Sequence, residues 1–436
     1  MPVKRNSLPH PSYKRTIDYL YGMKRFGIRM NLKGIKTALH LLGDPQRAFP
    51  SVHVGGSNGK GSTSAMLESI LKCAGYRVGL YTSPHLIRFN ERIRVGKREI
   101  PNRKVVELVD RIDSRLKTGG LRRINLTFFE FATAMAFLYF AECDVDIAIV
   151  EVGMGGRLDA TNVVRSIVSI ITNVSREHEV VLGKGIRSIA QEKGGIIKKG
   201  VPLVTSARGV ALKVLKEICG RRGTPIHVLG KDFKIELNSK NFDFLSRWYN
   251  HKCLRTNLEG AYQLFNAACA LGTVELLRDM QFSIDDIAIR EGLARVRWPG
   301  RFETVQRRPT VIIDCAHNPA GADALRGAIT TIGFRRLFLI LGIMDDKDIR
   351  GIVSRFAPLA HKIFITMPKT ERAASLKTLK KYIKPYSKTV VSIKDIAEAC
   401  NAAISNASDD DLVCITGSIF TAGEARKILI SKGTLA

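Results

Sequence analysis

Acidic residues, aromatic residues and long apolar runs are all scarce in this 436-residue chain. Aspartate and glutamate number 40 against 69 lysines and arginines, so the formal net charge is +29. Aromatic residues are only 7% and the basic residues lie scattered in pairs, which does not favour a dedicated nucleic-acid surface. The charge alternatively reflects a basic proteome or attraction of anionic substrates. No apolar run is long enough to span a bilayer, so we expect no membrane partner.

Paired cysteine motifs are also absent. The eight cysteines are scattered and none forms a Cys-x-x-Cys pair, which argues against a disulfide framework or a zinc site. Residues 1–15 are basic but lack the apolar core of a signal peptide. These features predict a cytoplasmic protein, which we expect to be a monomer.

Apolar strand-like runs alternate with helical patterns, which predicts an α/β protein with a mainly parallel sheet. Residues 231–257 instead alternate apolar and polar, as antiparallel strands do. The α/β alternation then restarts at residue 311. We predict a first domain over residues 1–298, containing a phosphate-binding loop, and a smaller Rossmann-like domain over 299–436. Strands are expected at 51–54, 77–82, 145–152, 167–173, 201–205, 311–314, 337–342, 362–366, 389–392 and 411–416.

The sequence GSNGKGS at residues 56–62 lies between a predicted strand and a predicted helix. A glycine-rich turn at a helix N-terminus presents backbone N–H groups to an anion, and Lys60 can reach the outer oxygens of a polyphosphate. The loop differs from the standard Walker pattern, because Gly61 follows the lysine and the hydroxyl comes one position later, at Ser62. We predict a nucleoside triphosphate site here.

Polar side chains follow several predicted strands. Glu151, Ser83 and His178 come after strands of the first domain, and Asp314 and His317 follow the first strand of the second. Ligands of open parallel sheets bind at the carboxyl ends of the strands, and a carboxylate beside a phosphate loop suits Mg²⁺. These residues therefore predict a metal and substrate site facing the space between the domains.

Seven motifs together resemble the folylpolyglutamate synthase/dihydrofolate synthase family of the Mur ligase superfamily, over residues 19–430. They are HVGGSNGKGS at 53–62, YTSPHL at 81–86, LTFFE at 126–130, EVGMGGRLDATN at 151–162, EKGGII at 192–197, PGRFE at 299–303 and DCAHNP at 314–319.

The resemblance implies an ATP-dependent amide ligase that joins L-glutamate to dihydropteroate or to the γ-carboxylate of a folate. In such enzymes ATP phosphorylates the acceptor carboxylate, and the glutamate amine then displaces phosphate. A carboxylate is a poor electrophile and phosphate a good leaving group, so the protein mainly supplies positioning and charge neutralisation.

The resemblance also assigns roles to particular residues. ATP contacts are implied for Asn58, Gly59, Lys60, Gly61, Ser62, Asn266, Arg301 and Asp314. Magnesium ligands are implied for Ser83, Glu151 and His178. Pterin contacts are implied for Thr127, Phe128, Phe129, Glu130, Leu158, Asp159 and Ala160. Catalytic roles are expected for Lys60, Lys193, His178 and His317.

Lys193 lies in a helical pattern, where a lysine is ordinarily exposed to solvent. The resemblance instead implies that Lys193 is carbamylated and helps to bind a second Mg²⁺. It further implies a monovalent cation as a candidate cofactor.

The chain departs from the family pattern at several positions, including Ser57, Arg176, Gly194 and Tyr262. Two other functions remain open at this point: a Mur-type ligase acting on another carboxylate substrate, and a nucleic-acid-dependent ATPase. The sequence does not separate dihydrofolate synthesis from polyglutamylation.

Overall fold

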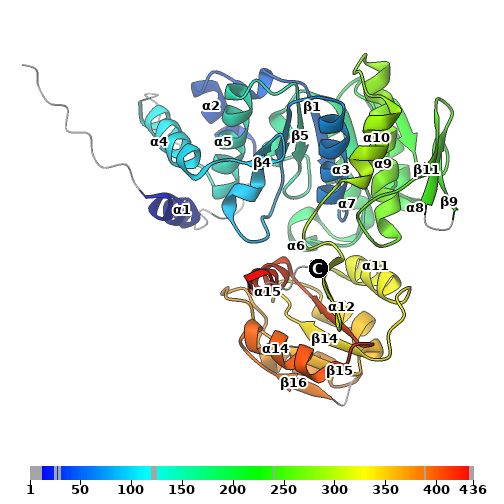
Figure 1. The fold of residues 1–436 in the computed structure, drawn as a ribbon. Helices are drawn as coiled ribbons and strands as arrows, with labels where there is room; N and C mark the ends of the chain where they lie inside the picture. Colours follow the sequence, from blue (N-terminus) through cyan, green and yellow to red (C-terminus); the bar gives the residue numbers. More distant parts are fainter. Residues whose placement is uncertain are drawn as a thin grey trace, which may run out of the picture.

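The computed structural model describes residues 12–23, 27, 31–118, 125–238, 241–386 and 389–431. Figure 1 shows two α/β bodies, a larger one built from the first two thirds of the chain and a smaller one built from the last third. The predicted α/β class is confirmed. None of the helices in the described residues combines the length and the apolar character needed to cross a membrane.

The larger body is organised around an eight-stranded sheet of order β4-β3-β2-β5-β1-β6-β7-β8. The sheet is parallel from β2 to β8, and at one edge β3 pairs antiparallel with both β2 and β4. The strands are β1 (Ser51–Gly55), β2 (Val78–Tyr81), β3 (Ile93–Val95), β4 (Arg98–Glu99), β5 (Ile147–Glu151), β6 (Ser166–Ile171), β7 (Leu203–Thr205) and β8 (Ile226–Val228). Central β1 is flanked by β5 and β6, so the residues that follow these three strands meet at one edge.

Helices cover both faces of this sheet, because its central strands are apolar on both sides. One face packs against α1 (Tyr13–Gly22), α2 (Lys33–Leu41), α4 (Asn102–Thr118) and α5 (Phe128–Glu142). The other face packs against α3 (Lys60–Cys73), α9 (Tyr262–Asp279) and α10 (Asp286–Ala294). The short α6 (Glu179–Leu182) precedes α7 (Gly185–Gly194), which packs with α8 (Gly209–Arg221) beside β6 and β7.

Three antiparallel strands form a separate small sheet of order β11-β10-β9, as the alternating pattern predicts. They are β9 (Phe233–Asn238), β10 (Asn241–Ser246) and β11 (Asn250–Leu254). Phe233, Phe242 and Phe244 are buried against the same core as α9. The small sheet therefore supports the helix that carries Asn266.

The smaller body contains a six-stranded sheet of order β12-β13-β17-β14-β15-β16, in which only the β12–β13 pair is antiparallel. Its strands are β12 (Glu303–Arg307), β13 (Thr310–Ile313), β14 (Leu337–Leu341), β15 (Lys362–Ile365), β16 (Val390–Ser392) and β17 (Leu412–Thr416). Its helices are α11 (Pro319–Ile329), α12 (Ile349–Phe356), α13 (Leu376–Ile383), α14 (Ile396–Asn406) and α15 (Ile419–Ser431). Figure 1 places α11 and α15 at the junction with the larger body.

Candidate active site

The glycine-rich loop joins β1 to α3, as the sequence predicts. Gly59 is the N-cap of α3 with a φ of 84°, and a Cβ at this position would collide with the side chain of Asn266. Glycine is therefore required both by the backbone conformation and by the approach of α9. Asn266 lies 207 residues after Gly59 in the sequence, and this contact places its side chain against the loop.

Hydrogen bonds hold the loop in shape. The Lys60 Nζ donates to the carbonyl oxygens of Gly56 at 3.0 Å and Ser57 at 3.1 Å. From the end of β6, the Asn173 Oδ1 accepts from the Asn58 N–H at 3.0 Å, and the Thr172 hydroxyl donates to the Asn58 carbonyl at 2.6 Å. The residues after β6 thus brace the loop, and its N–H groups are preorganised for an anion.

Trp298 occupies the space that a side chain directly after Lys60 would need. Its indole lies against the first turn of α3, where a Cβ at Gly61 would sit 2.8 Å from Nε1 of the ring. The Arg94 guanidinium lies over the same indole, 5.7 Å from the ring centroid, and pairs at 2.8 Å with the buried Glu68. A serine or threonine directly after Lys60 would displace this ring.

Two of the three predicted metal ligands are neighbours. Glu151 ends β5 and is buried, and its Oε2 accepts a hydrogen bond from the Ser83 N–H at 3.1 Å. Burial raises the pKa of the Glu151 carboxyl, while the charge of Lys60 acts against that shift. His178 is the N-cap of α6 with a φ of 48°, and burial, the Lys347 charge and the Lys60 charge lower its pKa.

These groups suit Mg²⁺ better than a softer metal. Among the residues that the structure describes, no group of three His, Cys, Asp or Glu side chains could hold a metal ion. Mg²⁺ commonly takes one or two carboxylates and completes its octahedron with phosphate oxygens and water. A buried carboxylate beside a serine and a phosphate loop fits that chemistry.

Lys193 is not solvent-facing, contrary to the ordinary expectation for a lysine in a helix. Its side chain is 2% exposed, and Nζ donates to Glu177 Oε1 at 2.7 Å and to the Gly56 carbonyl at 3.0 Å. Burial lowers the pKa of Lys193, and Glu177 opposes that shift. Burial likewise disfavours ionisation of Glu177, but the Lys193 and Lys60 charges outweigh it and lower its pKa to about 2. The α7 helix thus places an ion pair directly beneath the phosphate loop.

Asp314 lies at the start of the smaller body and is buried, with one acceptor position of Oδ1 left for a ligand. Its Oδ2 accepts from the Phe302 N–H at 2.8 Å and from the Tyr262 hydroxyl at 3.3 Å, and its Oδ1 accepts from the Ala316 N–H at 2.8 Å. Burial raises the pKa of Asp314 and the Arg301 charge opposes it. Tyr262, a departure from the family pattern, thereby connects α9 of the larger body to the second sheet.

A reciprocal amide pair joins the two bodies at the loop itself. The Asn318 Nδ2 donates to Asn58 Oδ1 at 2.9 Å, and the Asn58 Nδ2 donates to Asn318 Oδ1 at 3.3 Å. Asn318 also caps α11 by accepting from the Gly321 N–H. His317 lies beside this pair, its Nδ1 bonds to the Cys315 carbonyl at 2.9 Å, and burial lowers its pKa to about 4.

The segments predicted to bind a pterin share one hydrophobic cluster. Thr127 and Glu130 form a capping box at the start of α5, and Phe129 packs on Tyr81. Asp159 is buried and caps the short helix η4 (Ala160–Val163), accepting from the Met154 N–H and from both the N–H and the hydroxyl of Thr161. Internal donors thus occupy both Asp159 oxygens. Leu158 is half-buried beside it.

Sequence reasoning missed several residues that the fold brings to this edge. Glu177 stands in the sequence only as a neighbour of His178, and its partner lies in another element. Arg92 lies in a stretch of alternating charges and carries no local signal of burial, yet it is 7% exposed. The motif Ser83-Pro84-His85 was the nearest available signal, because His85 contacts Arg92.

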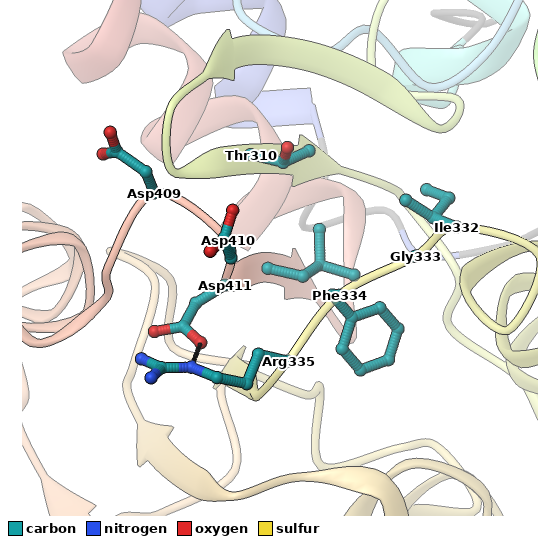
Figure 2. Close-up of a pocket in the computed structure, with 9 residues that line it drawn as sticks. Thr310, Ile332, Gly333, Phe334, Arg335, Asp409, Asp410 and Asp411 are labelled. Carbon is teal, nitrogen blue, oxygen red and sulfur yellow. Dashed lines mark hydrogen bonds and ion pairs between the residues drawn. The ribbon is translucent and has the colours of Figure 1, made fainter.

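A separate hollow of about 360 Å³ lies at the end of the second sheet away from Asp314 (Figure 2). It is formed by the chain entering β13, β14 and β17, including Thr310, Phe334 and Asp410. Asp411 is already paired with Arg335 and Arg336. The hollow faces away from the carboxyl ends of the strands, where a sheet of this type binds its ligands.

Comparison with protein families gives two matches in the order of the two bodies. The Mur ligase middle domain matches residues 54–274. The Mur ligase glutamate ligase domain matches residues 300–419. The predicted domain limit at 298/299 itself remains a prediction.

Whole-length relatives are also found. The dihydrofolate synthase/folylpolyglutamate synthase of Bacillus subtilis (strain 168) is 34% identical over 433 residues, covering 96% of this chain and 99% of the relative. The structure of E. coli FolC in complex with DHPP and ADP has a TM-score of 0.89 and 30% identity, covering 97% of this chain and 100% of that one. The Mycobacterium tuberculosis folylpolyglutamate synthase complexed with ADP has a TM-score of 0.88 and 30% identity, covering 96% and 99%.

Proposed function

The chain belongs to the dihydrofolate synthase/folylpolyglutamate synthase family of Mur ligases, and on this premise we propose that it ligates L-glutamate to dihydropteroate, to folates, or to both. The reaction consumes ATP and yields an amide, ADP and phosphate. The proposal rests on one observation. The β1–α3 phosphate loop, the Glu151–Ser83 pair and the Asp314 cluster all lie at the carboxyl ends of strands, where the two bodies adjoin.

Two steps account for the chemistry. An acceptor carboxylate oxygen attacks the γ-phosphorus of ATP, ADP leaves, and an acyl phosphate forms. The amine of glutamate then adds to the acyl carbon, loses a proton, and expels phosphate as the amide forms. Both steps concentrate negative charge on phosphoryl oxygens, so cations and N–H groups fixed in place lower the barriers.

Within this scheme the loop residues Asn58 to Ser62 cradle the phosphates of ATP. Lys60 moves its ammonium from the loop carbonyls to the phosphate oxygens. Asn266, Arg301 and Asp314 contact the nucleotide from α9 and from the second body. Because Asn58 and Asn318 already bond to each other, the second body stands within reach of the loop.

Mg²⁺ is assigned to Ser83, Glu151 and His178. When bound, it supplies charge neutralisation for the transferring phosphoryl group. Carbamylated Lys193 is assigned to a second Mg²⁺, and the lowered pKa of its amine supports reaction with carbon dioxide, since only the neutral amine is nucleophilic. A monovalent cation is a further proposed cofactor, on the resemblance alone.

His317 serves the incoming glutamate. With Nδ1 donating to the Cys315 carbonyl, the neutral ring presents Nε2 as a hydrogen-bond acceptor. A pKa of about 4 is too far below neutrality for an efficient general base. We therefore assign His317 to orienting the amine, and water or product phosphate accepts the proton.

The acceptor rests against Thr127, Phe128, Phe129 and Glu130 on one side and the 158–160 segment on the other. Since internal donors occupy both Asp159 oxygens, Asp159 acts by fixing the shape of that segment. We further propose a cytoplasmic monomer that acts on small molecules and has no specific nucleic-acid or membrane partner.

Steady-state ligation tests the function directly. ADP release is measured with dihydropteroate and with tetrahydrofolate, each with glutamate and ATP, and Lys60→Ala serves as the inactive control. Glutamate-dependent turnover with at least one acceptor is expected. Turnover only with UDP-muramyl substrates, or ATP hydrolysis stimulated by nucleic acid but not by glutamate plus acceptor, would overturn the proposal.

A further inference from the structure

Arg92 is a buried cation that makes no ion-pair contact with a carboxylate among the residues that the structure describes. It ends the short helix η3 (Phe89–Arg92) and is 7% exposed. The adjacent Glu91 does not serve, because its oxygens accept from the backbone N–H groups of Leu86, Ile87 and Arg88. A guanidinium taken out of water without a carboxylate in direct contact is costly unless a ligand completes the site.

The polar neighbour of Arg92 is neutral. The Arg92 Nε donates to Nδ1 of His85 at 2.8 Å, and arginine can only donate, so Nδ1 must be unprotonated. The His85 Nε2 lies 3.2 Å from the Tyr21 hydroxyl. His85 therefore fixes the orientation of the guanidinium without balancing its charge.

Arg92 contacts both the predicted pterin segment and the chain that leads to Ser83. Its Cζ is 5.1 Å from the ring centroid of Phe128, a residue of the predicted pterin segment. Its backbone carbonyl accepts from the Thr82 N–H, directly before Ser83. The Lys60, Arg301 and Arg92 charges each act to lower the pKa of Glu151, so all three cations lie within electrostatic range of this carboxylate.

We propose that Arg92 binds the α-carboxylate of the terminal glutamate of a folate acceptor, a proposal that rests on the proposed ligase function. Lys60 and Arg301 are assigned to the nucleotide, whereas Arg92 lies over Phe128 of the predicted pterin segment. A folate acceptor carries two carboxylates at this end, the reacting γ-group and the α-group, whereas dihydropteroate carries only the reacting one. Arg92 thus determines specificity for glutamylated acceptors.

The non-reacting carboxylate is the better ligand for physical reasons. A bidentate arginine on the reacting carboxylate would stabilise the ground state and withdraw electrons from the attacking oxygen. That interaction would be lost as the acyl phosphate forms, and so would slow the step. An arginine on the α-carboxylate keeps its bonds throughout, and positions the γ-group without opposing the reaction.

Arg92→Gln separates the acceptors. We expect its kcat/KM for tetrahydrofolate to fall on the order of 100-fold, since a charge-assisted bond to a buried partner is lost. The loss with dihydropteroate should be at least ten times smaller, about tenfold or less on the same scale. Arg92→Lys should recover part of the tetrahydrofolate loss. Arg88→Gln is the matched control, because Arg88 lies in the same segment but is exposed and paired with Glu99.

A second acceptor completes the test. A tetrahydrofolate analogue with the α-carboxylate replaced by a carboxamide should be a poor substrate for the wild-type enzyme. Arg92→Gln should discriminate much less between the analogue and tetrahydrofolate. Equal losses with both natural acceptors, or unchanged discrimination, would overturn the proposal, as would a wild-type enzyme that ligates dihydropteroate but no glutamylated acceptor. Failure of the wild-type enzyme with both acceptors would instead count against the ligase function.

Discussion

Replacing Lys193 by methionine should lower both stability and activity, and the two losses can be separated. Methionine keeps much of the length of the side chain but removes the ammonium. Glu177, whose side chain is 8% exposed, would then be left as a buried carboxylate without its partner at 2.7 Å. Breaking a buried ion pair in this way typically destabilises a protein by roughly 3–5 kcal/mol.

The double variant Lys193→Met/Glu177→Gln removes both charges, so most of the lost stability should return. Ligation should not return, because the double variant still lacks the amine that we assign to carbamylation. The stability change is measured from the first urea-unfolding transition followed by circular dichroism, and ligation from ADP release. Lys199→Met, which removes an exposed lysine five residues beyond Gly194, is the control and should change neither quantity.

Two results would refute the reasoning. A loss below about 1 kcal/mol in the single variant, measured on enzyme freed of carbon dioxide so that Lys193 carries its ammonium, is typical of exposed pairs and would mean that the ion pair is hydrated in solution. Full ligation activity in either variant would show that the Lys193 amine has no role in the reaction.

Four further changes have defined outcomes. Lys60→Ala should reduce ligation by about 10²–10³-fold at saturating ATP, measured as ADP release, because a cation on the transferring phosphate is lost; near-normal turnover would contradict the loop assignment. Glu151→Gln should raise the Mg²⁺ concentration needed for half-maximal activity, and an unchanged titration would exclude it as a ligand. Asp314→Ala should raise the KM for ATP more than that for glutamate, and the reverse order would move this residue to the amino-acid site. Burial lowers the pKa of His317 to about 4 in the folded protein, against an ordinary 6.5, so the unfolded chain binds a proton first as the pH falls. The free energy of unfolding should therefore decrease from about pH 6.5 towards pH 4. Urea titrations at several pH values should show this decrease, and His317→Gln should flatten it.

The site residues that could be predicted from the sequence are those that belong to a recognisable pattern of neighbouring residues. The loop at 56–62 is recognisable because strand, glycines and helix follow one another within a few residues. Glu151 and Asp314 are recognisable because each directly follows an apolar strand, and strand ends converge in a parallel sheet. The start of α5 also carries a local signal, since Thr127 and Glu130 have the spacing of a capping box.

The remaining contacts depend on tertiary packing. Nothing near Lys193 in the sequence distinguishes it from an exposed helical lysine, because its partner Glu177 lies before α6 and its second acceptor, the Gly56 carbonyl, lies on another strand end. Arg92 resembles its neighbours Arg88 and Arg94 in sequence, and only the packing of η3 against Phe128 sets it apart. The short β3 and β4 also escaped prediction, since two or three residues cannot establish a period.

The packing of Trp298 on Gly61 makes these two positions epistatic. A single change of Gly61 to serine, towards the standard Walker loop, would place a Cβ 2.8 Å from the indole and force the ring off α3. The same change should be nearly neutral where position 298 carries a small side chain, because the two residues share one volume. The order in which such substitutions can accumulate is therefore constrained: the tryptophan has to be lost before the glycine can be replaced. We therefore expect a change at position 298 to precede any change at position 61.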